Sequence, residues 1–346
     1  MSANQHPTDL VAEIVREYHR AEPHLAPIVR DAGISRLRRQ GVADAEQLVD
    51  EAIAAASPRS RVTKAHIGDV LERELERMHE PAIGISTPFR LLNHVIVGGF
   101  QPGELIYLGA RPAVGKSALA LDFARHVAKR GARVLLVSRE MHDLALARRM
   151  LAQEGHLPAS QLRLGASAID MRDVARVAEK LSGLPIWITD SAATLAEIDA
   201  MAEDTDFLIV DYLQLVVAPK EIRERRLQVE HSSAGLKALA LARQIPALCL
   251  SSLSRPKEGT NPEPTLASFR ETGEIEHDAD IAMLLHKPDQ HGDEVLCIIA
   301  KNRDGETGRV KLVFRRDWVS FHQAEDGMRY EPVPYEANGQ RDWVEQ

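Results

Sequence analysis

The run ARPAVGKS, residues 110–117, constrains the fold of this chain more than any other feature. It follows an apolar run typical of a strand, Leu105–Leu108, and opens a stretch with helical periodicity. A loop in this position presents backbone N–H groups and a helix N-terminus to phosphate oxygens. Within it, Lys116 pairs with the β- and γ-phosphates, and the Ser117 hydroxyl holds Mg²⁺. The sequence therefore predicts an ATP site made by Ala110, Arg111, Pro112, Ala113, Val114, Gly115, Lys116 and Ser117.

Strand-like and helix-like runs alternate from Glu104 onward. The expected strands lie at 105–108, 133–138, 185–189, 207–211, 247–253, 281–286, 296–301 and 310–315. The expected helices lie at 117–130, 141–154, 170–182, 194–204 and 224–243. Strands that alternate with helices form a parallel sheet covered on both faces. Because no helix separates the last three strands, an antiparallel extension is expected there, and the predicted fold class is α/β.

The first 62 residues have little strand character and are interpreted as a separate helical region. Apolar residues recur there at helical spacing, as in Leu10, Val11, Ile14, Val15 and Tyr18. Two or three short helices are expected, with the first pattern broken at Pro23, Pro27 and Gly33. Residues 64–80 form a further amphipathic helix, which either packs within the chain's own fold or docks on a neighbouring subunit.

Composition limits the class of partner. The formal net charge of −8 argues against a protein that coats nucleic acid over its whole surface, but it leaves room for a local basic channel. No stretch approaches the roughly 20 apolar residues of a membrane span, and no secretory signal is seen, so a cytoplasmic protein without a membrane partner is expected. Cys249 and Cys297 belong to no metal-binding or disulfide pattern and are expected to be buried thiols.

Two carboxylates follow predicted strands and are candidates for chemistry at the phosphate loop. Asp211 ends the apolar run 207–210, at the sheet edge where the phosphate loop also lies. It is either a ligand of Mg²⁺ or an ordinary strand-end residue in a turn. Glu140 follows the strand at 133–138, where it either activates the attacking water or favours the start of the next helix.

Six motifs in the same order resemble the C-terminal ATPase domain of DnaB-type replicative helicases, from about Gly84 to Phe321. They are ARPAVGKS at 110–117, SREM at 138–141, DYLQL at 211–215, LKALA at 236–240, FRETGEIEHDAD at 269–280 and KNRDG at 301–305. The family's phosphate loop also has alanine where the general pattern has glycine. The resemblance implies a RecA-like P-loop NTPase with a mostly parallel central sheet, an antiparallel C-terminal extension and a small helical N-terminal region. It also implies that Glu140 is the catalytic base.

The resemblance assigns roles that spacing alone does not. The residues that match Lys301 and Arg303 reach the γ-phosphate bound to the neighbouring subunit, which makes them catalytic across an interface. Head-to-tail contacts of this kind close into a ring, a hexamer in the family. The helix at 64–80 resembles the linker helix that packs on the adjacent protomer. Taken alone, Arg303 before Asp304-Gly305 fits a hairpin turn equally well.

Two segments are expected to contact single-stranded DNA on the same grounds. The segment with Arg270, Glu271 and Gly273 resembles a pore loop that binds the DNA backbone, although such an acidic run is otherwise a solvated loop. The family's other pore loop corresponds to a basic cluster at Lys220, Arg223, Arg225 and Arg226. Outside this motif set, that cluster would be a solvated helix start.

The chain departs from the family pattern at two places. The family has Gln in S-Q-L-N-R, where it senses the γ-phosphate and relays that state to the DNA loops. This chain reads Ser251-Ser252-Leu253-Ser254-Arg255, and the Ser252 side chain reaches much less far. The second departure is that residues 1–62 do not resemble the family's N-terminal collar, so primase recruitment is not carried over.

The predicted organisation is a short helical region at 1–62, a linker helix at 63–83, a RecA-like ATPase domain at 84–323 and a tail at 324–346. The predicted function is that of an ATP-dependent DnaB-like helicase or translocase that moves 5′ to 3′ on single-stranded DNA. The alternative is a RecA-like ATPase that acts as a switch or assembly factor without unwinding. Expected partners are single-stranded DNA, further copies of the chain in a hexameric ring, and a loader protein.

Overall fold

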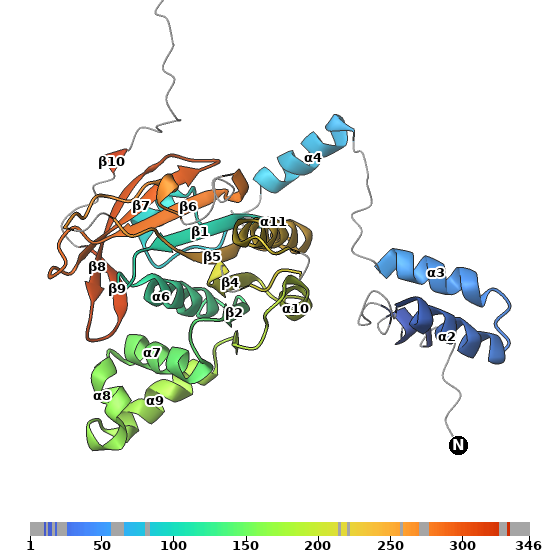
Figure 1. Cartoon of the computed structure of the whole chain (residues 1–346), viewed down its shortest axis with the longest axis horizontal. Coiled ribbons are helices and arrows are strands. Elements are labelled where there is room, and N and C mark those ends of the chain that lie inside the picture. The colour runs from blue at the N-terminus through green and yellow to red at the C-terminus, as the bar shows by residue number, and fades with distance from the viewer. Residues whose placement is uncertain are drawn as a thin grey trace, which may run out of the picture. The chain divides into compact units, whose positions relative to one another are not determined.

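The computed structural model describes residues 10–11, 13–15, 18, 26–56, 66–79, 84–213, 216–219, 222–256, 259–269, 277–324 and 331–332 (Figure 1). The chain divides into two compact units, residues 1–74 and 75–346, and the division falls inside helix α4 (Ile67–Met78). The domain boundaries drawn from the sequence stay predictions.

The smaller unit is helical. It contains α2 (Ala26–Arg39), α3 (Ala45–Ala56) and further helical residues between positions 10 and 18. The apolar residues with helical spacing do share a core, which consists of Leu10, Ile14, Val15, Ile34, Leu37, Ala45 and Val49. Burial of this set, rather than helix propensity, holds such short helices together.

The expected break at Pro27 and Gly33 is wrong, because both residues lie inside α2. Pro27 is the second residue of the helix, where its missing N–H would have no partner in any case. Gly33 faces the core, and a Cβ there would lie 2.6 Å from Cγ2 of Ile14. The absence of a side chain at Gly33 therefore lets α2 approach Ile14 closely. Pro23 lies outside the described residues.

Helix α4 confirms the amphipathic helix expected at 64–80, over residues 67–78. None of its residues is buried. Its large apolar side chains are all exposed, namely Ile67, Val70, Leu71, Leu75 and Met78. A contiguous apolar face of this kind marks an interaction surface.

The larger unit is built on a single mixed sheet, with strand order β10-β8-β7-β6-β1-β5-β4-β2-β3 and β9 paired with β8. The strands are β1 (Leu105–Ala110), β2 (Val134–Ser138), β3 (Ile186–Thr189), β4 (Phe207–Asp211), β5 (Ala247–Ser252), β6 (Ile281–His286), β7 (Glu294–Asn302), β8 (Gly308–Arg315), β9 (Ser320–Gln323) and β10 (Glu331–Pro332). The strands from β1 to β6 that pair with one another are parallel, whereas β7 to β10 pair antiparallel. This arrangement confirms the predicted fold class.

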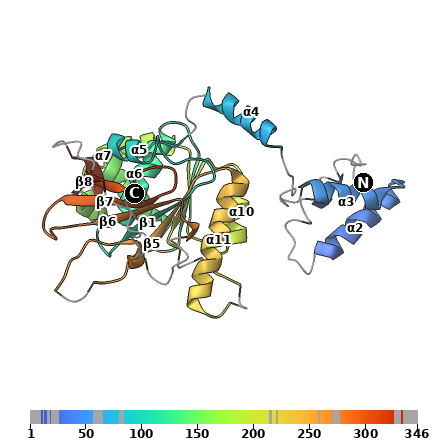
Figure 2. The same ribbon diagram turned by 90° about the horizontal axis from the view of Figure 1, so that it is seen from above.

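The helices of the larger unit are α5 (Arg90–Val95), α6 (Lys116–Ala128), α7 (Asp143–Gly155), α8 (Ala159–Leu164), α9 (Met171–Ser182), α10 (Leu195–Met201) and α11 (Arg225–Arg243). Helices cover both faces of the sheet, whereas α8 and α9 pack against α7. Helix α6 packs on one face, and α10 and α11 lie together on the other (Figure 2). The sequence did not predict α5 or α8, since six residues are too few to display a helical period.

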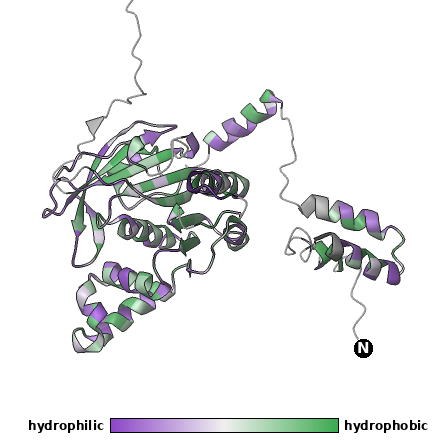
Figure 3. Ribbon diagram, viewed as in Figure 1, coloured by the Kyte–Doolittle hydropathy of each residue, from purple (hydrophilic) through white to green (hydrophobic). Residues whose placement is uncertain are grey.

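Strand β1 lies at the centre and all six of its residues are buried. Its side chains alternate between the two faces: Ile106 and Leu108 join the cluster under α6, while Leu105 and Tyr107 join the cluster under α11. Burial on both faces explains why the strand is continuously apolar. The colours of Figure 3 show the same concentration of hydrophobic residues in the central strands of the sheet.

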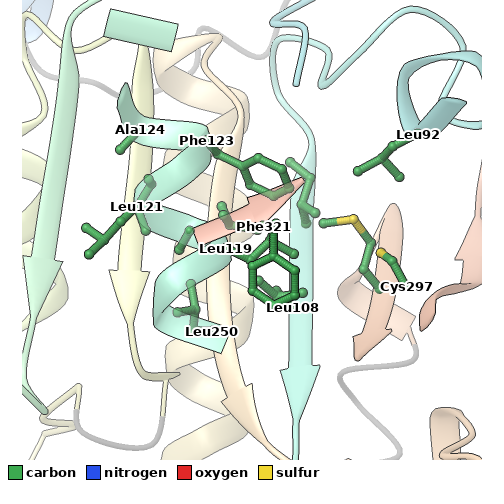
Figure 4. Close-up of a cluster of buried hydrophobic side chains, with 14 of the residues drawn as sticks. Leu92, Leu108, Leu119, Leu121, Phe123, Ala124, Leu250, Cys297 and Phe321 are labelled. Carbon is green, nitrogen blue, oxygen red and sulfur yellow. The ribbon is translucent and has the colours of Figure 1, made fainter. Parts of the chain in front are cut away.

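The cluster under α6 is the larger core of the unit (Figure 4). It joins Leu119 and Phe123 of α6 to Leu108 of β1 and to Phe321 of β9. Cys297 lies in this cluster, and burial raises the pKa of its thiol to about 12. Cys249 is also buried, so both cysteines are free, buried thiols as expected.

A buried polar network ties α6 to the β8–β9 hairpin. The Asp122 carboxylate on α6 accepts hydrogen bonds from Arg125 Nη2 (2.8 Å), Ser320 Oγ (3.0 Å) and the Phe321 backbone N–H (2.7 Å). From α7, Gln153 Nε2 donates to the Ala118 and Val319 carbonyl oxygens, at 3.0 and 2.8 Å. These contacts hold the hairpin against the helix that begins at the phosphate loop.

Within the described part of the chain, no helix is long and apolar enough to cross a membrane.

Asp122 gives a stability prediction. Burial raises the pKa of its carboxyl from 3.8 to about 6, against the lowering effect of Arg125. Relative to Asp122→Asn, the free energy of unfolding should therefore be greatest below about pH 4 and fall by up to about 3 kcal/mol as pH rises through about 6. Urea unfolding of both proteins between pH 4 and 7 measures this difference. A difference that is constant with pH, or that grows, would contradict the prediction.

Candidate active site

The carboxyl ends of four parallel strands meet at one edge of the sheet. The pairing register sets Ala110 of β1 beside Ser252 of β5, and Asp211 of β4 beside Ser138 of β2. The phosphate loop follows β1 and Glu140 follows β2. Ligands of open α/β sheets bind outside this edge, so the register brings the predicted residues to the expected place.

Left-handed backbone shapes the phosphate loop. Ala113 has φ of 64° and Gly115 has φ of 111°. Gly115 is the N-cap of α6, and a Cβ there would lie 2.8 Å from Cζ of Phe321. Glycine is thus required at 115 both for the backbone conformation and for the close approach of the β8–β9 hairpin.

Lys116 lies between two carboxylates. Its Nζ is 3.5 Å from Oδ1 of Asp211 and 3.8 Å from Oε2 of Glu140. Ser117 Oγ donates to Oδ2 of Asp211 at 2.7 Å. The Asp211 side chain is 3% exposed, whereas Glu140 is 50% exposed, so one carboxylate is held inside and the other faces the solvent side of the loop. The structure brings these four predicted residues together.

A cavity of 280 Å³ opens beside this cluster. Most of the predicted loop lines it, together with Glu140 and Ser252. Five further lining residues were not predicted as site residues: Ala118, Met141, Arg149, Phe314 and Val319. Phe314 and Val319 belong to the β8–β9 hairpin, more than 190 residues along the chain from the loop, and no local motif marked them. Arg149 lies on α7, a single arginine on an ordinary helical pattern.

Two buried polar atoms at this site have no hydrogen-bond partner within the described residues, Oδ1 of Asp211 and Nε of Arg111. A buried carboxylate oxygen without a donor is costly unless a cation or donor completes it. Asp211 together with the Ser117 hydroxyl offers two oxygens of the kind that Mg²⁺ prefers. Arg111 and Lys116 offer positive charge for phosphate. The residues present therefore fit a nucleotide with its Mg²⁺.

Lys301 and Arg303 lie at the opposite edge of the sheet. Arg303 Nη1 is 2.7 Å from Oδ1 of Asp280, and Oδ2 of Asp280 accepts from the Leu105 N–H at the start of β1 (2.8 Å). Strand β1 spans about 17 Å at about 3.3 Å per residue, more than an arginine side chain can bridge. Neither residue therefore belongs to the phosphate cavity of its own chain.

The predicted DNA-contacting residues divide into two groups. Arg223, Arg225 and Arg226 are exposed at the start of α11. Arg226 Nε is 2.7 Å from Oε1 of Glu230, an ordinary pair within the helix. The remaining members lie outside the described residues: Lys220, Arg270, Glu271 and Gly273.

Residues 84–323 match the family described as DnaB-like helicase C terminal domain. The chain belongs to this family. Among curated relatives of this DnaB-like chain is the replicative DNA helicase DnaB of Leifsonia xyli subsp. xyli, 36% identical over 256 residues, which are 69% of this chain and 55% of that protein. Replicative DNA helicase DnaB of Treponema pallidum is 36% identical over 254 residues, 71% of this chain and 57% of that protein. The chain thus spans a little over half the length of these relatives.

Solved structures agree on the fold. One solved ATPase domain superposes with a TM-score of 0.68 at 26% identity, and the match covers 76% of this chain and 100% of that domain. A DnaB-like replicative helicase, studied with its primase interactions, has a TM-score of 0.68 at 24% identity, over 88% of this chain and 81% of that one. This DnaB-like chain therefore shares the fold of these solved structures.

Gly115 gives a prediction for the loop. In Gly115→Ala, the new Cβ adds a clash with Phe321 to a strained backbone, so we expect a loss of about 2–5 kcal/mol in the free energy of unfolding. Gly131→Ala is the matched control, because Gly131 has φ of 91° and a Cβ there would meet nothing within 4 Å. It should cost only about 1–2 kcal/mol. Equal losses in denaturant unfolding would show that the contact with Phe321 has no effect.

Proposed function

We propose that this chain is an ATP-hydrolysing DnaB-like helicase or translocase that moves on single-stranded DNA as a ring. The observation that carries the proposal is the cluster of Lys116, Ser117, Asp211 and Glu140 beside one cavity in a DnaB-like ATPase fold. The 5′-to-3′ direction rests on the resemblance to the family. Curated relatives that carry the name replicative DNA helicase support the same activity.

ATP binding is assigned to the loop 110–117. Its backbone N–H groups and Lys116 neutralise the phosphates, and Arg111 adds a second cation on the cavity wall. Ser117 and Asp211 would hold Mg²⁺, which when bound offsets the charge that develops on the phosphates. Lys116 Nζ already lies 3.5 Å from Asp211 Oδ1, so its side chain has little conformational freedom to lose when phosphate binds.

Glu140 is assigned as the general base. The residue lines the cavity, and its Oε2 is 3.8 Å from Lys116 Nζ, so the carboxylate lies beside the lysine assigned to the phosphates. A carboxylate there orients a water and accepts its proton, which contributes roughly 10²- to 10⁴-fold in rate. The alternative, a residue that only favours the start of α7, is disfavoured because Glu140 lies before the N-cap His142 and contacts Lys116 instead.

Assembly into a ring is supported by where Arg303 and Lys301 lie. Since they are at the edge away from their own phosphate loop, they can contribute to hydrolysis only at the site of another subunit. A head-to-tail arrangement satisfies this requirement for every subunit when the ring closes, as a hexamer in the family. The exposed apolar face of α4 is assigned to the same subunit contact. A loader protein and a cytoplasmic location belong to this proposal.

Single-stranded DNA is assigned to Arg270, Glu271 and Gly273 and to the exposed arginines Arg223, Arg225 and Arg226. The three arginines precede or begin α11, which follows β4 along the chain, and β4 ends at the edge of the sheet that carries the phosphate loop. Phosphate contacts by such a cluster would make binding strongly dependent on salt.

The alternative, a switch or assembly ATPase without unwinding, is motivated by Ser252. It lines the cavity, but its hydroxyl is too short to follow the γ-phosphate as glutamine does. If no other residue replaced that contact, the rate of ATP hydrolysis would be the same with and without DNA.

Hydrolysis with and without single-stranded DNA tests the proposal, with Lys116→Ala as the inactive blank. We expect DNA to stimulate turnover by roughly five-fold or more, which corresponds to about 1 kcal/mol of coupling. We also expect the wild type to displace a strand from a forked duplex. A rate of hydrolysis that is unchanged by DNA, together with no strand displacement, would favour the alternative function as a switch or assembly ATPase.

Mixing two inactive variants tests hydrolysis across subunits. Arg303→Ala keeps its own phosphate loop, and Lys116→Ala keeps its arginine, so a mixed ring contains some complete interfaces. Random equal mixing should restore roughly a quarter of wild-type turnover, because one neighbouring pair in four has both groups. If Arg303 acted within its own chain, the mixture would stay inactive.

A further inference from the structure

The phosphate loop makes a side-chain contact with a distant segment. Nη1 of Arg111 donates to Oδ1 of Asn261 at 2.8 Å, across 150 positions of sequence. The loop between β5 and Phe269 also touches the phosphate loop at its base, where the Leu253 N–H donates to the Ala110 carbonyl at 3.1 Å. The described parts of this loop therefore join the phosphate loop at two separate points.

Asn261 is held firmly on its other side. Its Nδ2 donates to the carbonyl oxygens of Lys287 (2.9 Å) and Pro288 (3.1 Å), just after β6. Two residues on, Glu263 forms a salt bridge of 2.7 Å with Arg309 of β8. Asn261 is exposed, so its three hydrogen bonds are not needed to satisfy buried groups. They fix the amide in one orientation, with its oxygen toward Arg111.

The same loop leads directly to the segment assigned to DNA. Leu253 and Phe269 form an antiparallel bridge that closes the loop, and the Ser254 N–H donates to the Ser268 carbonyl at 2.8 Å. Phe269 then packs edge-on against Tyr107 of β1, with ring centroids 6.0 Å apart. The described residues 261–269 thus connect Asn261 to the residue that immediately precedes position 270.

Arg111 is suited to respond to a bound phosphate. It lines the cavity, and its Nε is buried without a partner among the described residues. A guanidinium has five N–H donors in a rigid, planar fork, so a new partner at one nitrogen reorients the others. An anion that recruits Nε would turn Nη1 and change the bond to Asn261.

We propose that Arg111 and Asn261 link the nucleotide site to the segment 259–269 and so perform the positioning role for which Ser252 is too short. This inference rests on the proposed function, because it needs ATP at the phosphate loop. A ligand shifts a segment only if the contacts of that segment differ between bound and free states. Arg111 provides that difference, since it touches both the cavity and the loop.

Amide hydrogen exchange tests the link without DNA. We compare exchange in peptides covering 259–269 with and without a non-hydrolysable ATP analogue and Mg²⁺. The analogue should slow exchange there by roughly five-fold or more in the wild type, and should have no such effect in Asn261→Ala, with unchanged affinity for the analogue. Glu263→Ala is the matched control: it removes another anchor of the same loop without touching Arg111, and should keep the response.

The outcomes separate the inference from the proposed function. If the wild type does not bind the analogue, the link and the proposed function are both overturned. If it binds but exchange at 259–269 does not change, or if Asn261→Ala responds like the wild type, the link alone is overturned. Equal loss in Glu263→Ala would reduce Asn261 to one of several loop anchors, which also overturns it.

Hydrolysis gives a second readout. Asn261→Ala should keep the basal rate of ATP hydrolysis but lose the stimulation by single-stranded DNA, which is roughly five-fold or more in the wild type. Glu263→Ala should keep both the basal rate and the stimulation. Normal stimulation in Asn261→Ala would contradict the link. A fall in the basal rate of Asn261→Ala that equals its loss of stimulation would contradict it as well.

Discussion

Strand β1 is hydrogen-bonded to parallel neighbours on both sides and is buried on both faces, and the site depends on that placement. The hydrophobic gain from burying each large side chain, about 1.5–3 kcal/mol, fixes which face each residue takes. A slip of one position would turn Ile106 and Leu108 away from the core under α6. The fixed register then decides where β1 ends, and hence where the phosphate loop meets Asp211 and Ser252.

Electrostatics at the edge of the sheet follows from this geometry. Asp211 is buried at the end of β4, and Lys116 and Ser117 reach it from the first turn of α6. A buried carboxylate is tolerated because the Lys116 cation near Oδ1 and the Ser117 hydroxyl on Oδ2 offset part of its charge. Oδ1 accepts no hydrogen bond within the described residues, so it fits a further ligand such as Mg²⁺. The opposite edge has a similar arrangement, where Asp280 binds Arg303 and Lys237. The sheet keeps these two charged clusters apart, so the role proposed for Arg303 in hydrolysis requires a second subunit.

The β8–β9 hairpin completes the cavity from outside the parallel core. Asp122 and Gln153 hold it against α6 and α7, and Phe314 and Phe321 pack on one another 4.7 Å apart beside Gly115. Residues that bind the phosphate loop to the hairpin therefore also shape the space for a ligand. On the other side, Asn261 holds Arg111, so the loop is supported by two late segments of the chain.

The sequence by itself determined the α/β class, the order of the motifs along the chain and four residues of the site. Lys116, Ser117, Glu140 and Asp211 were predictable because each stands directly at a strand end or helix start, where a local pattern reports position. It also predicted the antiparallel extension, because strands without intervening helices can pair only through short turns. The tertiary structure alone decided that Arg149, Phe314, Val319 and Asn261 surround the same loop. Their neighbours in space are about 30 to 200 positions away in sequence, and only packing of the whole sheet brings them together. The same holds for Arg303, whose distance from its own phosphate loop is set by the length and direction of β1 and β7 rather than by any motif.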